Sequence, residues 1–252
     1  MEQQRRDISK AEKRQFRKDK RQQKQIQKMQ DQMPDLKIVQ TAPDTETKRL
    51  CAMNETQAHY IISILKNRLT LGIGPAGTGK TYCCGALAAE AILAGTIDKI
   101  IITRPAQEAG EKLGSLPGEL EDKYEPYIEP FRDVLNERMG KARVDSMVKC
   151  GHIQAKPLAY MRGKTFKNAF VILDEGQNTS PTQMKLFLTR IGEGCTVIVN
   201  GDVKQVDIYG ESGLADAVRR LRELEGINVV EFTKADIVRS GLCQQIVEAY
   251  EG

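Results

Sequence analysis

Residues 74–81 read GPAGTGKT and form a complete phosphate-binding loop. The motif G-x-x-x-x-G-K-[ST] is filled at its fixed positions by Gly74, Gly79, Lys80 and Thr81. Such a loop needs a strand before it and a helix after it. The chain supplies an apolar run at Leu69–Ile73 and a helix-forming run at Tyr82–Leu93. We therefore predict a strand, a loop and a helix in this order, which is the unit that holds nucleotide phosphates.

The residue types of this loop indicate how it would bind ATP with Mg²⁺. Glycines allow successive backbone N–H groups to turn toward a phosphate chain, and the following helix directs its positive end at the same group. Lys80 supplies charge for the β- and γ-phosphates, and the Thr81 hydroxyl is a candidate Mg²⁺ ligand. The predicted phosphate cradle comprises Gly74, Pro75, Ala76, Gly77, Thr78 and Gly79.

Short apolar runs alternate with helical patterns through the rest of the chain. Further buried strands are predicted at Lys99–Thr103, Asn168–Leu173, Cys195–Val199 and Asn228–Phe232. Helices are predicted at about 54–67, 127–139, 142–149, 180–190, 213–223 and 237–250, and residues 104–125 are expected to form an irregular insertion. Alternating strands and helices predict an α/β fold with a mostly parallel sheet flanked by helices.

The N-terminal segment has a different composition from the rest. Residues 1–28 carry a net charge of +7, whereas the remaining residues carry −3. We expect residues 1–48 to be a basic, Gln-rich extension and linker, helical or disordered, and residues 49–252 to be the folded domain. The extension is interpreted either as a solvated segment or as a basic arm that contacts nucleic-acid phosphates.

Composition also narrows the class of protein. No apolar stretch approaches the ~18 residues that cross a membrane, and the charged N-terminus is unlike a secretory signal. The six cysteines show no CxxC or zinc spacing, so we expect small buried residues in a reducing cytoplasm. With two histidines in the chain, we expect no histidine-based metal site.

Acidic residues follow two of the predicted strands. Asp174 is expected to hold Mg²⁺ and Glu175 to accept a proton from the attacking water, because ligands bind at the carboxyl ends of parallel strands. The alternative is an acidic pair at a helix start. Asp202 and Gln205, in GDVKQ after the next strand, are expected to sense the γ-phosphate, with a polar turn as the alternative.

Two further residues are candidates on weaker patterns. The Gln57 amide is able to pair with adenine N6 and N7, although Asn54 and Gln57 also fit a helix start. Arg239 is a candidate for neutralising transition-state charge, with a surface arginine as the alternative. No N-K-x-D guanine signature occurs, which disfavours a GTPase.

Taken together, these stretches resemble the PhoH-like family of P-loop ATPases and, more broadly, the first motor domain of superfamily-one helicases. The most family-specific stretch is GEKLGSLPGEL at 110–120, after Thr103-Arg104-Pro105. The resemblance implies a RecA-like core, a ring-shaped homohexamer that places Arg239 at a neighbour's nucleotide, and links to phosphate starvation. It also implies RNA or single-stranded DNA as partner, with Arg104 as a candidate contact.

Two classes of function follow from this reading. The first is a cytoplasmic, Mg²⁺-dependent ATPase that works on RNA or single-stranded nucleic acid; with no second motor domain in the chain, we do not expect a monomeric translocating helicase. The second is a nucleotide-gated interaction module with slow hydrolysis, which the low aromatic content of 5% favours because single-strand platforms usually stack bases on aromatics. A small-molecule kinase would need an acceptor pocket and lid, and no stretch of the sequence identifies either.

Overall fold

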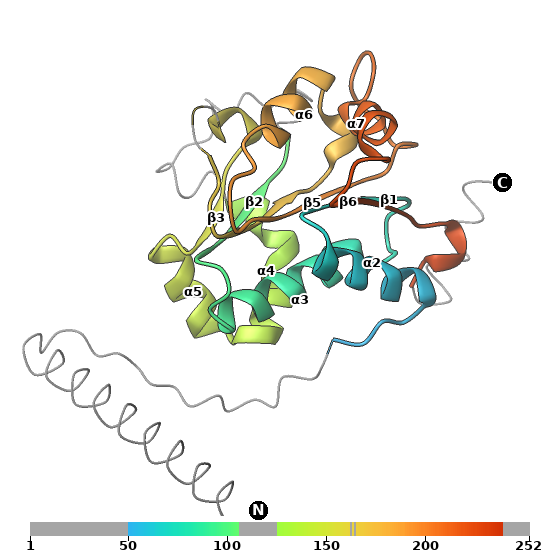
Figure 1. Cartoon of the computed structure of the whole chain (residues 1–252). Helices are drawn as coiled ribbons and strands as arrows, with labels where there is room; N and C mark the ends of the chain where they lie inside the picture. Colours follow the sequence, from blue (N-terminus) through green and yellow to red (C-terminus); the bar gives the residue numbers. More distant parts are fainter. Residues whose placement is uncertain (1–49, 106–124, 162, 164, 239–252) are drawn as a thin grey trace, which may run out of the picture. The chain divides into compact units, whose positions relative to one another are not determined.

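Six strands form a single sheet in which every neighbouring pair is parallel (Figure 1). The computed structural model describes residues 50–105, 125–161, 163 and 165–238, which all belong to the unit Thr47–Gly252. The strands are β1 (Leu69–Ile73), β2 (Lys99–Thr103), β3 (Ile153–Ala155), β4 (Ala169–Leu173), β5 (Thr196–Gly201) and β6 (Ile227–Glu231), in the order β3-β2-β4-β5-β1-β6.

Helices cover both faces of the sheet (Figure 1). One face carries α2 (Glu55–Lys66), α3 (Lys80–Leu93), α4 (Glu125–Met139) and α5 (Lys141–Lys149), and the other carries α6 (Pro181–Leu188) and α7 (Gly213–Leu221). Parallel strands require crossover connections, and helices on both faces are the usual result. The α/β fold predicted from the sequence, with a mostly parallel sheet flanked by helices, is confirmed.

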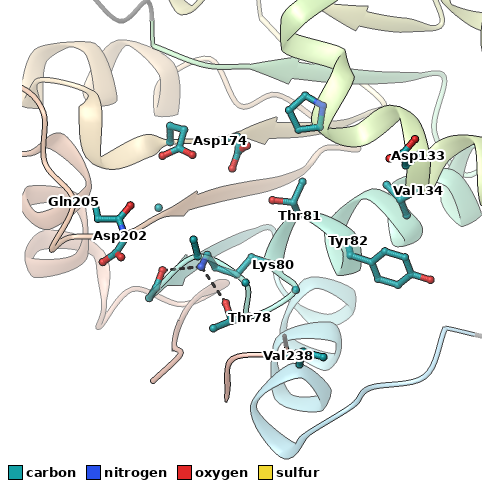
Figure 2. Close-up of a pocket in the computed structure, with 17 residues that line it drawn as sticks. Thr78, Lys80, Thr81, Tyr82, Asp133, Val134, Asp174, Asp202, Gln205 and Val238 are labelled. Atoms are coloured by element: carbon teal, nitrogen blue, oxygen red, sulfur yellow. Dashed lines mark hydrogen bonds between the residues drawn. The ribbon is translucent and has the colours of Figure 1, made fainter. Parts of the chain in front are cut away.

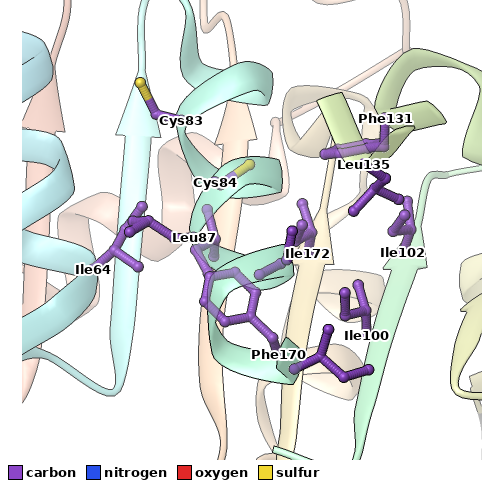
Figure 3. Packing of buried hydrophobic residues seen from close by; sticks show 14 of the residues in the cluster. Ile64, Cys83, Cys84, Leu87, Ile100, Ile102, Phe131, Leu135, Phe170 and Ile172 are labelled. Atoms are coloured by element: carbon purple, nitrogen blue, oxygen red, sulfur yellow. The ribbon is translucent and has the colours of Figure 1, made fainter. Parts of the chain in front are cut away.

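Alternate residues of each strand pack into two separate hydrophobic cores, one on each face of the sheet. In β2, Ile100 and Ile102 pack with α3 and α4, whereas Ile101 packs on the opposite face. The first core, which also contains Phe170 and Ile172 of β4, is shown in Figure 3. Because successive side chains point to opposite faces, a strand buried on both sides must be apolar throughout, as these short runs are.

A close contact between two helices brings α4 toward the nucleotide loop. A Cβ atom on Gly85 of α3 would lie 2.6 Å from Cγ1 of Val134 on α4. A glycine at this position therefore lets the two helices approach more closely than a side chain would permit. The approach matters for the site, because α3 begins within the loop and α4 then stands beside it.

Some expectations differ from the structure. The strand β3 was not predicted, because IQA is three residues long with a polar residue at its centre, too short to show a periodicity. Ile237 and Val238 are not helical, and the remainder of the helix predicted at 237–250 lies outside the described residues. The expectation that the cysteines are buried was wrong for Cys51 and Cys150, which are exposed.

Other expectations concern parts of the chain that the structure does not describe. The basic extension and the insertion stretch at 110–120 lie outside the described residues. None of the described helices has the length and apolar character needed to span a membrane.

The core assignment predicts a stability difference between two isoleucines. Ile172 at the centre of β4 is fully buried, whereas Ile62 on α2 is 47% exposed. Ile172→Ala should lower the free energy of unfolding by about 3 kcal/mol through lost burial and an unfilled cavity, and Ile62→Ala by less than about 1 kcal/mol. Urea unfolding followed by circular dichroism measures both, and equal losses would contradict the assignment.

Candidate nucleotide-binding site

The phosphate-binding loop joins the end of β1 to the start of α3, as predicted. Three of its glycines have positive φ: Gly74 (140°), Gly77 (83°) and Gly79 (83°). A Cβ on Gly74 would lie 2.3 Å from the Phe232 carbonyl oxygen, so any side chain there would displace the chain after β6. The loop conformation therefore depends on glycine both for its backbone angles and for its packing.

Lys80 is held inside the loop by the loop's own oxygens. Its Nζ donates to the Gly74 carbonyl (2.7 Å) and to Thr78 Oγ1 (3.1 Å) (Figure 2). It also donates to the Pro75 carbonyl (2.8 Å) and lies 5.6 Å from the centre of the Phe232 ring. Burial lowers the pKa of Lys80, and the nearby carboxylates, Asp202 first, oppose that shift. Phosphate oxygens carry full charge and are stronger acceptors than carbonyls, so the ammonium is positioned to exchange one set of partners for the other.

Two further segments of the chain, each following a strand, begin beside the loop. Asp174 and Glu175 follow β4, and Asp202 follows β5, which lies between β4 and β1 in the sheet. The register pairs Ile73 with Gly201, so the loop and Asp202 leave the sheet side by side. Parallel strands thus bring three distant segments of sequence to one edge.

These segments enclose a cavity of about 440 Å³. Of the predicted residues, Gly74, Ala76, Gly77, Thr78, Gly79, Lys80, Thr81, Asp174, Glu175, Asp202 and Gln205 line it (Figure 2). Pro75 contributes its carbonyl to Lys80 instead. Arg239 lies outside the described residues, although Val238 before it lines the cavity and donates its N–H to the Gly77 carbonyl at 2.9 Å.

Sequence reasoning missed the wall that α4 contributes. Pro130, Asp133 and Val134 line the cavity together with Tyr82, although α4 is far from the loop in sequence. No local motif marks them, since their place follows from the close packing of α3 and α4. The one available signal was the glycine at position 85 within a helical pattern, which indicates a close helix contact.

Gln57 reaches the loop, but both ends of its amide are used by backbone groups. Its Nε2 donates to the Thr78 carbonyl at 3.0 Å, and its Oε1 accepts the Met53 N–H at 2.9 Å. The Asn54 side chain caps α2 by accepting the Gln57 N–H at 2.8 Å. The helix-start interpretation of Asn54 is therefore confirmed. The adenine role of Gln57 stays a prediction that requires its amide to change partners.

Arg104 forms an ion pair with Asp174. Its Nη2 and Nε lie 2.5 Å and 3.1 Å from Asp174 Oδ2. The Asp174 side chain is 8% exposed and that of Arg104 is 26% exposed, so the guanidinium neutralises a nearly buried carboxylate while keeping some access to solvent. The predicted nucleic-acid contact of Arg104 stays a prediction.

The donor set fits Mg²⁺ bound together with a nucleotide. Thr81 and Asp174 both line the cavity and offer hard oxygen ligands. Within the described residues there is no group of three or more His, Cys, Asp or Glu side chains able to hold a metal alone. Mg²⁺ in nucleotide sites takes one or two protein ligands and completes its shell with phosphates and water, which agrees with this sparse set.

The parallel sheet, the glycine loop with its buried lysine and the acidic strand ends have the arrangement of a P-loop NTPase site. Comparison with known proteins gives the family: the family model described as "PhoH-like protein" matches residues 49–251. The chain belongs to the PhoH-like family, as the sequence motifs implied.

Relatives in bacteria match over most of this chain. It is 48% identical over 197 residues to a PhoH-like protein of Bacillus subtilis (strain 168), covering 77% of this chain and 62% of that protein. It is 46% identical over 224 residues to Protein PhoH of Escherichia coli (strain K12), covering 87% and 63%. The chain thus spans less than two thirds of the length of either relative.

Among solved structures, the Pif1 helicase from Candida albicans matches with a TM-score of 0.41 and 13% identity, covering 80% of this chain and 44% of that one. A score of this size is too low to establish a shared fold.

The Arg104–Asp174 ion pair predicts that Arg104 and Mg²⁺ compete for the Asp174 carboxylate. In Arg104→Gln the Asp174 carboxylate loses its cation, so the Mg²⁺ concentration that supports half-maximal nucleotide binding should fall by about fivefold, the equivalent of ~1 kcal/mol. Titration of Mg²⁺ against a fluorescent ATP analogue measures this midpoint. Arg222→Gln, which removes a surface pair with Glu231, is the control. An unchanged or higher midpoint in Arg104→Gln would contradict the competition.

Proposed function

We propose that the protein is a Mg²⁺-dependent ATPase that acts on RNA or single-stranded DNA as a ring-shaped homo-oligomer, with a hexamer as the expected size. The observation that supports hydrolysis is the convergence of Lys80, Thr81, Asp174, Glu175 and Asp202 on one cavity at the carboxyl edge of the sheet. Binding of a nucleotide requires the first two. An acid pair beside them at the end of β4 is the arrangement expected of hydrolysis.

In this proposal each side chain has a separate task. Lys80 exchanges the Gly74 and Pro75 carbonyls for β- and γ-phosphate oxygens. Thr81 and Asp174 hold Mg²⁺, which when bound neutralises negative charge on the phosphates. Glu175 orients the attacking water and accepts its proton. Asp202 and Gln205 lie at the end of β5 and respond to the presence of the γ-phosphate.

Arg239 completes the proposed set. Val238, the residue before it, lines the cavity and donates its N–H to the Gly77 carbonyl of the loop. The arginine can serve its own nucleotide or, in a ring, the nucleotide of a neighbour. Its role is to neutralise charge that develops on the transferred phosphoryl group.

The nucleic-acid partner is proposed from charge. The +7 charge of residues 1–28 suits a polyphosphate backbone, and Arg104 keeps a partly exposed guanidinium near the metal ligand. Membership of the PhoH-like family and the cysteine pattern also favour, in our proposal, a cytoplasmic protein linked to phosphate starvation.

A nucleotide-gated interaction module is the alternative function. Among the described residues, the exposed large hydrophobic side chains are mostly aliphatic, with Tyr82 and Tyr209 as the aromatic members. A surface with few aromatics suits a protein partner better than stacked bases. In this alternative, ATP sets an assembly state and hydrolysis is slow.

Steady-state ATP hydrolysis with and without single-stranded RNA or DNA tests the proposal. Wild-type turnover should rise with nucleic acid, and Lys80→Ala should lose at least about a hundredfold of that turnover because the charge on the phosphates is left unneutralised. Glu175→Gln should retain binding of a fluorescent ATP analogue while losing turnover. Hydrolysis that is indifferent to nucleic acid would favour the interaction module, and turnover that survives in Lys80→Ala would reject the site.

Deletion of residues 1–33 tests the basic extension. The truncated protein should bind single-stranded RNA more weakly, with a flatter dependence of log Kd on log salt concentration, because fewer phosphate counterions are released. Fluorescence anisotropy at several salt concentrations measures both quantities. The Lys80→Ala full-length protein serves as the control with an intact extension. Equal affinity and slope in the truncated protein would reject the arm.

A further inference from the structure

The buried side chain of Gln177, behind Asp174 and Glu175, has no role in the mechanism proposed above. Gln177 lies in the 3₁₀ turn Gly176–Asn178, directly after Glu175, and is 1% exposed. Its Nε2 donates to Glu175 Oε2 at 2.7 Å, and its Oε1 accepts the Asp202 N–H at 3.0 Å. The amide therefore bridges the segment after β4 and the segment after β5.

The chemistry of the two partners determines the orientation of this amide. A backbone N–H can only donate, so Oε1 must face Asp202. A carboxylate can only accept, so Nε2 must face Glu175. The two contacts support the same orientation, and the reversed amide would lose both hydrogen bonds.

The surroundings leave the amide little freedom to move. A Cβ on Gly201 would lie 2.4 Å from Gln177 Oε1, so the end of β5 must be glycine for the amide to fit. Ser212 Oγ donates to the Gln177 carbonyl at 2.8 Å and fixes the backbone of the turn. A Cβ on Gly176 would lie 2.7 Å from Val199 Cγ1, which shows how closely the turn packs on β5.

Glu175 depends on this contact for its position. Its backbone adopts φ 54°, in the left-handed region, which costs a residue other than glycine roughly 1 kcal/mol. Within the part of the chain that the structure describes, Gln177 is the one residue that donates a hydrogen bond to the Glu175 carboxylate. Without this hydrogen bond, the Glu175 carboxylate could adopt several rotamers and would have to be ordered again in each catalytic cycle.

We infer that Gln177 is a positioning residue that holds the general base Glu175 and the Asp202–Gln205 segment in one fixed relation. The inference rests on the proposed ATPase function and adds a residue to it. The base and the γ-phosphate-responsive segment then form a single unit, and the Gln177 amide passes a displacement of either segment directly to the other. If Gln177 had a purely structural role, its substitution would destabilise the fold. It would not lower kcat while leaving KM for ATP unchanged.

Two substitutions at Gln177 test the two hydrogen bonds that its amide makes. Gln177→Glu keeps an oxygen for the Asp202 N–H but replaces the donor to Glu175 by a second carboxylate. Gln177→Met has a similar volume and loses both hydrogen bonds without burying a charge. Asn178→Asp is the matched control, because it makes the same amide-to-carboxylate exchange one residue along the turn. The Asn178 side chain bonds Asp207, and the Asn178 backbone N–H that donates to the Glu175 carbonyl is kept by the substitution.

Turnover, binding and amide exchange are then measured on the full-length proteins. Gln177→Glu and Gln177→Met should lower kcat by about ten- to a hundredfold, with KM for ATP within about threefold of the wild type, because orientation of the base is lost and nucleotide binding is kept. Amide hydrogen exchange of peptides that contain Asp202 should accelerate in Gln177→Met and stay near the wild-type rate in Gln177→Glu. Asn178→Asp should keep kcat within about threefold, with urea unfolding of each variant as the check on folding.

The outcomes distinguish the inference from the proposed function. Absence of Lys80-dependent turnover in the wild type would reject the ATPase and the inference with it. Normal wild-type turnover with an unchanged kcat in Gln177→Glu would overturn the inference alone. An equal loss of kcat in Asn178→Asp would also overturn it, since the effect would then follow from any carboxylate buried in the turn.

Discussion

Parallel hydrogen bonding between β4, β5 and β1 is the constraint on which the rest of the site depends. Each of these strands ends at the same edge of the sheet, and each is followed at once by a segment of the candidate site. The register of the central pairs fixes the relative heights of the loop, the acid pair and Asp202. A slip in register would move every side chain to the wrong face and would also separate these segments, so packing of the core and assembly of the site are one requirement.

Burial of charge explains the contacts within the cavity. Lys80, Asp174 and Asp202 are each less than 10% exposed, and a buried charge without a partner is strongly unfavourable. Lys80 is satisfied by carbonyls of the loop, Asp174 by Arg104, and Asp202 Oδ1 by the Lys204 N–H at 3.0 Å. These partners keep the residues in place in the protein alone, and phosphates and a metal ion are the stronger partners that would exchange with them.

The sequence allowed prediction of the features that are local in the chain. The glycine loop, five of the six strands and the acidic residues at two strand ends follow from patterns within a few residues, and the structure places them as expected. The features that were missed depend on contacts between distant segments. The α4 wall follows from helix packing at Gly85, and the pairing of Arg104 with Asp174 follows from the adjacency of β2 and β4. For Gln57, the sequence showed an amide near the loop but could not show that backbone groups occupy it.

The two functions considered for this protein share the same binding cradle, and the difference between them lies elsewhere in the site. The loop and Lys80 lie between β1 and α3, and both proposals use them to hold the nucleotide. In the proposed ATPase, hydrolysis further requires a carboxylate held at a fixed position. The proposal assigns this role to Glu175, which Gln177 ties to the segment after β5. A gated module would need the same connection for a different purpose, because loss of the γ-phosphate must be passed from one segment to the next. The order of Glu175 and of the turn that carries Gln177 would therefore matter in both functions, but it would control the chemical step only in the ATPase.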